Sequence, residues 1–349
     1  MKLTIDCRFI GKSGIGTYIE NVVEAMIRLY PDNEYLLVVE KVLPQYGGMA
    51  NVCQMVTDIK PFTIRELLCF PTKEINHTDV FFSPYINIPF GIRVPVYSTI
   101  HDVIFWDKPE LVSKVGLWMR TFFVKHAMWA SKGVFTVSEF SKGRITHHFN
   151  CKKPITVVPN GVASRIRDYN GSVAKEDYIL FVGNVKEHKG LDVLVAAYQE
   201  ARKMGLTSTL TIVGNKDNFR TSANAFLAEA LNDDSIAFTG RLSNEDLVET
   251  IAKAKVLVLP SFYEGFGIPP MEALYVGTDA IVSDIEVLNE IYRDLPVTFF
   301  KCGDRHDLAD KLLNHNTVDF KQQDIKELID RLYSYEKAAR MVMDVIGGK

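Results

Sequence analysis

Two glutamates eight positions apart, Glu264 and Glu272, are the side chains whose spacing most clearly indicates chemistry. Between them lie a glycine loop and two prolines, and the apolar run Val256–Leu259 comes just before. This order predicts a strand, a loop and a helix whose free amides can bind phosphate or sugar oxygens. We expect Glu264 in the loop and Glu272 in the first helical turn, both able to hold hydroxyl groups. Alternatively, Glu272 only complements the helix dipole and Glu264 is a solvated loop acid.

A second loop of small residues contains Gly14 and Gly16, before an amphipathic helix that we expect to start near Tyr18. Glycines let backbone amides approach an anion closely. The pair resembles a dinucleotide fingerprint, but Ile19 stands where the third glycine belongs and no acid clearly closes the second strand. A tight turn without a ligand is the alternative, and a nicotinamide oxidoreductase ranks last among the functions considered.

Three histidines call for separate interpretation. His101 follows the apolar run at residues 96–100, and the carboxyl end of a strand is where open α/β sheets bind ligands. A histidine that caps the next loop through a backbone bond is the alternative. His147 and His148 fall in a predicted helix with no matching acid nearby, so we interpret them as surface residues.

The elements that position these residues alternate between short apolar runs and longer segments of helical period, which predicts parallel sheets covered by helices on both faces. A chain of 349 residues exceeds the size at which one core usually stops growing, so we expect two domains. Their predicted limits are 1–162 and 173–325, with a polar linker between them and a closing helical segment at 326–349. Predicted strands lie at residues 3–5, 35–39, 80–82, 96–100, 134–137, 155–158, 178–182, 210–213, 236–238 and 256–259, and predicted helices at 190–204, 219–231 and 244–253.

Composition narrows the class of protein. Apolar residues make up 47% of the chain, as in a soluble globular protein, and the net charge of −3 gives no field that attracts nucleic acid. The five cysteines form no CxxC pair, which favours reduced thiols in a cytoplasmic protein. No apolar stretch reaches the ~18 residues of a membrane span. No Asp-x-Asp pair ends a strand, so we expect neither a metal nor another cofactor.

The segment from Glu264 to Glu272 resembles the E-x7-E motif of the retaining family-4 glycosyltransferases, which belong to the group 1 glycosyl transferases and have the GT-B fold. Residues 181–191 resemble that family's glycine loop and lysine, and residues 136–141, 158–162 and 334–339 also match family positions. The similarity extends over almost the whole chain. It departs at residues 277–284, which lack the Gly-x-Pro-Val pattern, and at Tyr335, which replaces a tryptophan.

This resemblance implies two Rossmann-like doubly wound domains facing across a cleft, the first for the acceptor and the second for a nucleotide sugar, with the last helix returning to the first domain. Glu272 would bind the ribose hydroxyls, while Glu264, Lys189 and His101 would act in catalysis beside the donor sugar and diphosphate. Asn184 stands where relatives often have arginine, so the second cation could be Lys186, or amides could replace it; a solvated helix start is the alternative for both lysines. The expected nucleotide-sugar-binding residues are Gly14, Gly16, Gly183, Asn184, Lys186, Lys189, Glu264, Gly265, Phe266, Gly267, Ile268 and Glu272.

The activity that the resemblance implies is metal-independent transfer of a hexose, with retention, from a nucleotide diphosphate sugar onto a glycan or lipid-linked acceptor, in the synthesis of surface polysaccharide or glycoconjugates. Similarity to mannosyl- and rhamnosyltransferases favours a mannose-like donor carried by GDP. The alternatives on the same fold are a sugar-nucleotide epimerase, a phosphorylase, and a sensor that binds a sugar nucleotide without transfer.

Residues 114–129 mix aromatic and basic side chains at helical spacing. Such a helix could rest on a membrane surface that carries a lipid-linked acceptor, giving peripheral association at the inner face. We favour the alternative that its aromatic face packs on the first domain.

Overall fold

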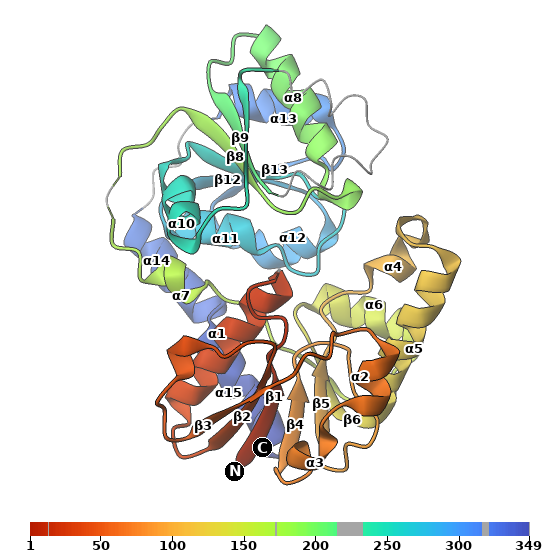
Figure 1. Cartoon of the computed structure of the whole chain (residues 1–349). Helices are drawn as coiled ribbons and strands as arrows, with labels where there is room; N and C mark the ends of the chain where they lie inside the picture. The colour runs from red at the N-terminus through yellow and green to blue at the C-terminus, as the bar shows by residue number, and fades with distance from the viewer. Residues whose placement is uncertain (13, 172, 215–232, 316–320, 349) are drawn as a thin grey trace. The chain divides into compact units, whose positions relative to one another are not determined.

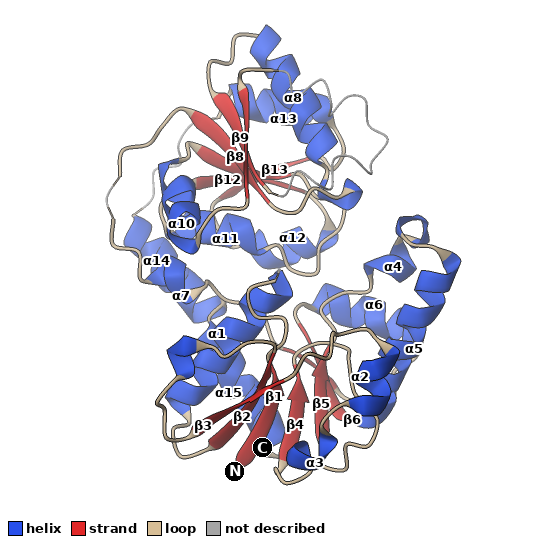
Figure 2. Cartoon of the chain, viewed as in Figure 1, coloured by secondary structure: helices blue, strands red, loops and turns tan. Residues whose placement is uncertain are grey.

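The computed structural model describes residues 1–348 except 13, 172, 215–232 and 316–320. The chain divides into two compact units. Unit 1 comprises Met1–Asn160 and Tyr333–Lys349, and unit 2 comprises Gly161–Leu332. Each unit contains one parallel sheet with helices on both faces (Figure 2), so the prediction of two Rossmann-like doubly wound domains is confirmed.

Unit 1 is built on a seven-stranded parallel sheet in the order β3-β2-β1-β4-β5-β6-β7 (Figure 1). Its strands are β1 (Lys2–Asp6), β2 (Glu34–Val39), β3 (Val52–Val56), β4 (Val80–Ser83), β5 (Val96–Thr99), β6 (Ser131–Thr136) and β7 (Ile155–Val157). Its α-helices are α1 (Gly14–Leu29), α2 (Ile64–Cys69), α3 (Thr72–Ile75), α4 (Ile104–Asp107), α5 (Lys114–Ala130), α6 (Glu139–Phe149) and α15 (Tyr335–Ile346).

Unit 2 has a six-stranded parallel sheet in the order β10-β9-β8-β11-β12-β13. Its strands are β8 (Tyr178–Val182), β9 (Thr209–Val213), β10 (Ile236–Gly240), β11 (Val256–Leu259), β12 (Asp279–Ser283) and β13 (Val297–Phe300). Its helices are α7 (Ser164–Arg167), η3 (Glu187–Lys189), α8 (Leu191–Lys203), α10 (Asn244–Lys253), α11 (Ile268–Tyr275), α12 (Glu286–Tyr292), α13 (Arg305–Leu313) and α14 (Gln322–Leu332).

Both sheets reverse their strand order at one point. In unit 1 the chain builds outward in one direction from β1 and in the other from β4, and in unit 2 the same reversal separates β8 from β11. The loops that leave the carboxyl ends of these neighbouring strands turn in opposite directions, which opens a crevice where such folds bind ligands. These two switch points are therefore the places to look for a site.

The strands are found where apolar runs predicted them, but β3, β12 and β13 were missed. β3 is a partly exposed edge strand, and its mixed pattern gave little signal. β12 is fully buried, but its residues were noted only because they lack the family's Gly-x-Pro-Val pattern. The predicted helix at 219–231 lies outside the described residues.

Two helices differ from expectation. α1 extends back to Gly14, so Gly14 and Gly16 belong to its first turn rather than to a preceding loop. The segment predicted as a linker contains α7, which supplies a residue to the site of unit 2. The closing helical segment predicted at 326–349 contains the end of α14 and all of α15. α15 packs Tyr335, Ala338 and Val342 into the core of unit 1, as expected for a last helix that returns to the first domain.

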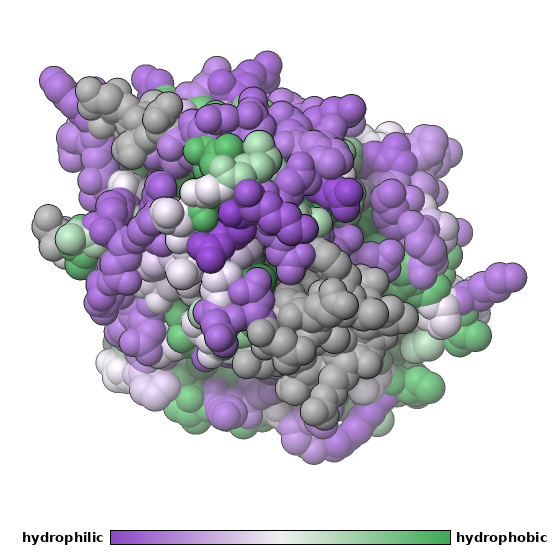
Figure 3. Space-filling model, turned by 90° about the horizontal axis from the view of Figure 1, so that it is seen from above, coloured by the Kyte–Doolittle hydropathy of each residue, from purple (hydrophilic) through white to green (hydrophobic). Residues whose placement is uncertain are grey.

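The outer surface follows the composition. The face of the molecule in Figure 3 is mainly hydrophilic, with small hydrophobic areas between polar residues. Helix α5 differs from this hydrophilic surface. It buries Phe123 and Met128, but its Trp118 and Trp129 are exposed. The expectation that its aromatic face packs on unit 1 is therefore wrong for the two tryptophans.

Candidate functional site

Two loops meet at the switch point of unit 2. One follows β8 and the other follows β11. The backbone amide of Phe262 donates to the carbonyl of His188 over 2.8 Å. Gly190 has φ +63°, and a Cβ there would lie 2.1 Å from the carbonyl oxygen of Pro260, so only glycine fits this contact. The backbones of the two loops are thus fixed against each other.

Lys189 and Glu264 face each other across this junction. The Lys189 Nζ donates to Oε1 of Glu264 over 2.7 Å and to Oε2 over 2.8 Å. The buried Ser261 hydroxyl donates to the same Oε1 over 2.7 Å, and the Ser283 hydroxyl in turn bonds to the Ser261 carbonyl. The side chains of Lys189 and Glu264 remain 22% and 10% exposed, so the ion pair lies at the surface of the site. Two residues predicted from distant parts of the sequence are therefore in direct contact.

The loop after β11 leads into α11 through Gly267. This residue has φ +86°, and a Cβ there would lie 2.6 Å from the Leu288 side chain. The Tyr292 hydroxyl donates to the Gly267 carbonyl and accepts from the Met271 amide, which fixes the start of the helix. Ile268 is the first helical residue, so Glu272 is the fifth and lies in the second turn, not the first as predicted.

Glu272 is paired with a residue that the sequence analysis missed. Its Oε1 accepts from Arg165 Nη2 over 2.9 Å, and its side chain is 4% exposed. Burial raises the pKa of Glu272, and the positive charge of Arg165 opposes that shift. Within the described part of the chain, no hydrogen-bond donor contacts its Oε2. The only sequence signal for Arg165 was a basic residue in a segment taken for a linker.

The remaining predicted residues of unit 2 surround this core. Gly183 continues the β8 ladder, its amide donating to the Val213 carbonyl, while Asn184 and Lys186 are exposed. Phe266 is buried and Gly265 is half-buried. The nucleotide-binding role of these residues stays a prediction.

His188 lies in the same loop as Lys189. Burial and, to a smaller extent, the neighbouring positive charge of Lys189 lower its pKa to about 4, although Glu264 acts in the opposite direction. A histidine with that pKa is neutral at physiological pH. The positive charge of this loop therefore comes from its lysines.

The other predicted residues, His101, Gly14 and Gly16, belong to unit 1. His101 Nε2 donates to the Pro84 carbonyl over 2.9 Å, and its ring meets the edge of Tyr18. Burial lowers the pKa of His101, so the imidazole is neutral with its free lone pair on Nδ1. The histidine thus bonds to the backbone, as in the alternative interpretation, but to the loop after β4 and not to the next loop. A contact with donor sugar stays a prediction.

The two glycines of α1 differ from each other. A Cβ on Gly16 would lie 2.3 Å from the Phe9 carbonyl oxygen, which accounts for this glycine by packing alone. Gly14 is exposed, with nothing within 4 Å of the Cβ position. Their predicted part in nucleotide-sugar binding is not needed to explain Gly16.

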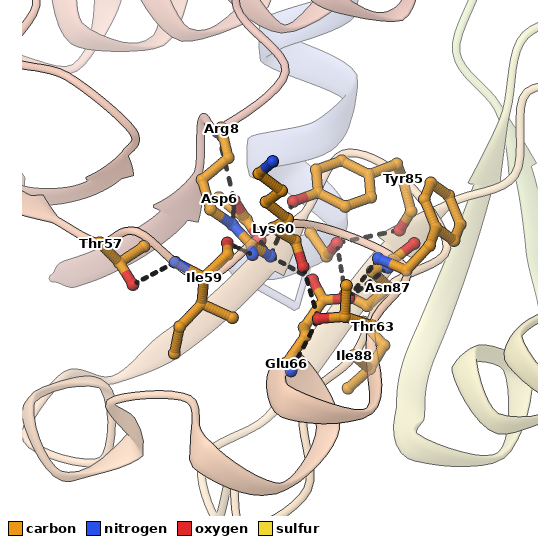
Figure 4. Close-up of polar contacts among 12 residues, drawn as sticks. Asp6, Arg8, Thr57, Ile59, Lys60, Thr63, Glu66, Tyr85, Asn87 and Ile88 are labelled. Atoms are coloured by element: carbon orange, nitrogen blue, oxygen red, sulfur yellow. Dashed lines mark hydrogen bonds and ion pairs between the residues drawn. The ribbon is translucent and has the colours of Figure 1, made fainter.

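The switch point of unit 1 holds a buried charge cluster (Figure 4). Arg8, fully buried, donates to both oxygens of Asp6 over 2.9 and 2.6 Å, to Glu66 and to the Tyr85 hydroxyl. Glu66 also accepts from Asn87 over 2.6 Å. Burial raises the pKa of Glu66, and Arg8 opposes the shift. Sequence analysis missed this cluster, in which Arg8 and the two acids satisfy one another, while the side-chain oxygen of Asn87 is buried without a hydrogen-bond partner.

With this geometry in view, comparison with known proteins assigns the family. The model of group 1 glycosyl transferases matches residues 163–341, about half of the chain, and that of glycosyltransferase family 4 matches residues 75–164. The chain belongs to the group 1 glycosyltransferases.

Curated relatives of this glycosyltransferase family member include mannosyltransferases. The O-antigen chain mannosyltransferase RfbU of Salmonella typhimurium is 31% identical over 195 residues, which cover 55% of this chain and 53% of that protein. O-antigen chain mannosyltransferase B of Escherichia coli is 25% identical over 232 residues, covering 62% and 59%. The chain thus spans a little more than half the length of these relatives.

Solved structures of glycosyltransferases share the fold. Sucrose-phosphate synthase from Thermosynechococcus elongatus superposes with a TM-score of 0.75 at 17% identity, covering 100% of this chain and 98% of the other. HepE from Anabaena, in complex with UDP and glucose, also gives 0.75, at 13% identity and full coverage of both. These likenesses show the fold alone, and it is the GT-B fold that was predicted.

A third polar cluster, around His148, lies outside the switch points. His148, interpreted as a surface residue without an acid, bonds to Asp107 over 2.6 Å, and Arg144 binds the same carboxylate. That interpretation was wrong for His148, because α4 brings Asp107 from a distant part of the sequence; His147 is exposed as expected.

Over the described ranges, no three His, Cys, Asp or Glu side chains lie together as a metal site would require. A search of the same residues finds no helix with the length and apolar character needed to cross a membrane.

Proposed function

We propose that this protein is a glycosyltransferase that moves a hexose from a nucleoside diphosphate sugar onto a glycan or lipid-linked acceptor, in the synthesis of surface polysaccharide or a glycoconjugate. The observation that carries the proposal is the contact between Lys189 and Glu264 at the switch point of unit 2. Parallel sheets bind nucleotides at this place, and the pair provides the charge and the acceptor oxygens that such a ligand needs.

Each residue has a proposed task. Lys189 neutralises the diphosphate as negative charge develops on the leaving group, and amides at the start of α11 assist it, so that no metal is required. Glu272 holds the ribose hydroxyls through its carboxylate. Glu264 releases Lys189 to the phosphates when the donor arrives and then accepts from a hydroxyl of the donor sugar.

The donor we propose is a mannose-like hexose carried by GDP, transferred with retention. Support comes from the two O-antigen chain mannosyltransferases among the relatives. The five cysteines are free thiols, as expected for action in the cytoplasm.

The test begins with nucleotide binding. Purified full-length protein is heated with UDP, GDP, dTDP, CMP or NAD, with and without a chelator. GDP at about a hundred times its Kd should stabilise the protein by about 2.7 kcal/mol, and a chelator should not change the shift. The absence of a shift with every nucleoside diphosphate, or a shift with NAD alone, would overturn the proposal.

Turnover and site are tested next. Release of mannose from GDP-mannose, with and without a lipid-linked glycan acceptor, separates a transferase from a protein that binds the donor without using it. Lys189→Met should abolish most of the release and weaken GDP binding about ten- to a hundredfold, because one charge-assisted contact is lost. Lys203→Met, a change of the same kind at an exposed lysine at the end of α8, should cost less than about threefold. Equal losses in both variants would remove Lys189 from the proposed role.

A further inference from the structure

Helix α5 presents an exposed apolar stripe. Trp118 and Trp129 are 71% and 77% exposed, and Val115, Met119 and Phe122 are exposed beside them. Positions 115, 118, 122 and 129 recur at helical spacing, so their side chains share one face of the helix. A soluble domain rarely displays two tryptophans in this way, because each adds a large apolar area to the surface.

Helix α2 carries further exposed apolar residues. Its outward residues Ile64 and Leu68 are 74% and 68% exposed and lie one turn apart. Phe62, just before α2, meets the ring of Phe123 of α5 at 5.6 Å between centroids. The exposed apolar residues of α2 and α5 therefore lie on neighbouring elements (Figure 1). We call residues Phe62, Ile64, Leu68, Val115, Trp118, Met119, Phe122 and Trp129 the aromatic face.

The support beneath α2 is rigid. Glu66, on the inner side of α2, is fully buried against Arg8, and its second oxygen accepts from the Phe62 amide over 2.7 Å (Figure 4). Thr63 caps the helix by accepting from the Glu66 amide. Phe62 itself has φ +62°, a left-handed conformation that is costly for a bulky residue and persists only where its surroundings impose it. The buried cluster thus holds apolar side chains outward in a fixed arrangement.

The charged residues of α5 itself are all basic. No aspartate or glutamate occurs from Leu111 to Ser138, whereas Lys114, Lys125 and Lys132 are exposed within that stretch. This helix combines tryptophan and phenylalanine with lysine and contains no acid. Such a composition is typical of a segment that lies in the headgroup region of an anionic bilayer. A site for a protein partner carries no such need for uniform positive charge.

We propose that the aromatic face binds the surface of an anionic phospholipid bilayer, with the tryptophans entering the headgroup region and the lysines contacting lipid phosphates. The proposal deepens the proposed function and rests on it in one respect, because a bilayer is where a lipid-linked acceptor would be presented.

The test uses the full-length protein and vesicles with about 30% anionic phospholipid, compared with vesicles of zwitterionic lipid only. Wild type should float with the anionic vesicles at low salt and be released at high salt. Brominated phospholipid should quench its tryptophan fluorescence, since Trp118 and Trp129 are two of the three tryptophans.

Three variants test which side chains bind the vesicles. Trp118→Ser with Trp129→Ser should lower the vesicle partition coefficient about tenfold or more, and Lys114→Gln with Lys125→Gln should lower it on anionic vesicles alone. The matched control, Val42→Ser with Met204→Ser, changes residues that are 61% and 57% exposed elsewhere and should bind vesicles like wild type.

Two results would overturn the proposal. One is vesicle binding that is absent in the wild type or equal in wild type and the tryptophan variant. The other is light scattering that shows a wild-type dimer converted to a monomer by the tryptophan changes, with no vesicle binding, since the face would then join two copies. The nucleotide-induced thermal shift of the tryptophan variant should match that of the wild type. It reports on the switch point of unit 2, so failure of membrane binding and failure of the proposed function give different results.

Discussion

Replacing Arg165 with methionine should make nucleotide binding dependent on pH. Arg165 Nη2 donates to Glu272 Oε1 over 2.9 Å, and the side chain of Glu272 is only 4% exposed. Burial raises the pKa of Glu272, and Arg165 is the charge that opposes the rise. Methionine keeps the apolar stem of the side chain but leaves the carboxylate without its partner, so the pKa of Glu272 should rise further.

The magnitude follows from the geometry. Breaking a fully buried pair costs about 3–5 kcal/mol, and because Arg165 is 19% exposed and Glu272 can take up a proton, we expect about 2–3 kcal/mol of lost stability. A protonated Glu272 accepts less strongly from a ribose hydroxyl, and a hydrogen bond to a charged group contributes about 1.5–3 kcal/mol. Affinity for the nucleoside diphosphate should therefore fall about ten- to a hundredfold at low pH and recover as the pH rises through the new pKa of Glu272.

Isothermal titration calorimetry from about pH 6 to about pH 9 measures this profile. Arg167→Met is the matched control, because Arg167 lies on the same helix and pairs with Asp330 at 3.5 Å with both side chains about one third exposed. It should change affinity by less than about twofold. If Arg165→Met binds nucleotide with wild-type affinity and a flat profile, Glu272 does not hold the ligand in its charged form. Equal losses in both variants would mean that α7 as a whole, not the ion pair, matters.

Other perturbations of the site have distinct signatures. Glu264→Gln should bind nucleoside diphosphate a few times more tightly in calorimetry, because Lys189 loses its competing partner, while sugar transfer falls; weaker binding would contradict the proposed exchange of partners. Gly190→Ala should lower the free energy of unfolding by more than about 2 kcal/mol in urea titrations, whereas Gly205→Ala, with φ +109° but open space around the Cβ position, should lose only about 1 kcal/mol. The folded pKa of His188 is about 4, below an unfolded value of about 6.5. Its stabilising contribution is therefore complete above pH 6.5 and lost as pH falls toward 4; urea midpoints of wild type and His188→Gln that run parallel over this window would refute the shift.

The sequence was informative where a function needs one local segment. The run that ends at Leu259, the glycines after it and Glu264 predicted a strand, a loop and an acid at its end, because each of these depends only on near neighbours in the chain. A helix start close after Gly267 was also predictable, but its exact first residue, Ile268, was not, and Glu272 was therefore placed one turn too early.

The sequence could not predict ion pairs between residues that only the fold brings together. Arg165 and Glu272 are 107 positions apart, and nothing local marks one basic residue of a polar segment as the partner of a buried acid. Arg8 and Glu66 are likewise separated by 58 positions. The prediction that the aromatic face of α5 packs on unit 1 was wrong for a different reason. Apolar residues at helical spacing form the same sequence pattern whether the face is buried or exposed, and only the surrounding fold distinguishes the two cases.

The two switch points share their topology but differ in how their charges are balanced. In unit 1, Arg8 is fully buried and is bound by Asp6 and Glu66. A ligand there would have to replace several buried charge-assisted bonds, each expensive to leave unmade, so this switch point stabilises the fold and fixes α2. In unit 2, Lys189 has a single acidic partner and keeps 22% of its side chain exposed. An incoming diphosphate can replace Glu264 as the partner of Lys189, while the Ser261 hydroxyl continues to donate to Glu264. The same position in two similar sheets can therefore hold the framework in one unit and bind a ligand in the other, and the number of acids around the cation determines which.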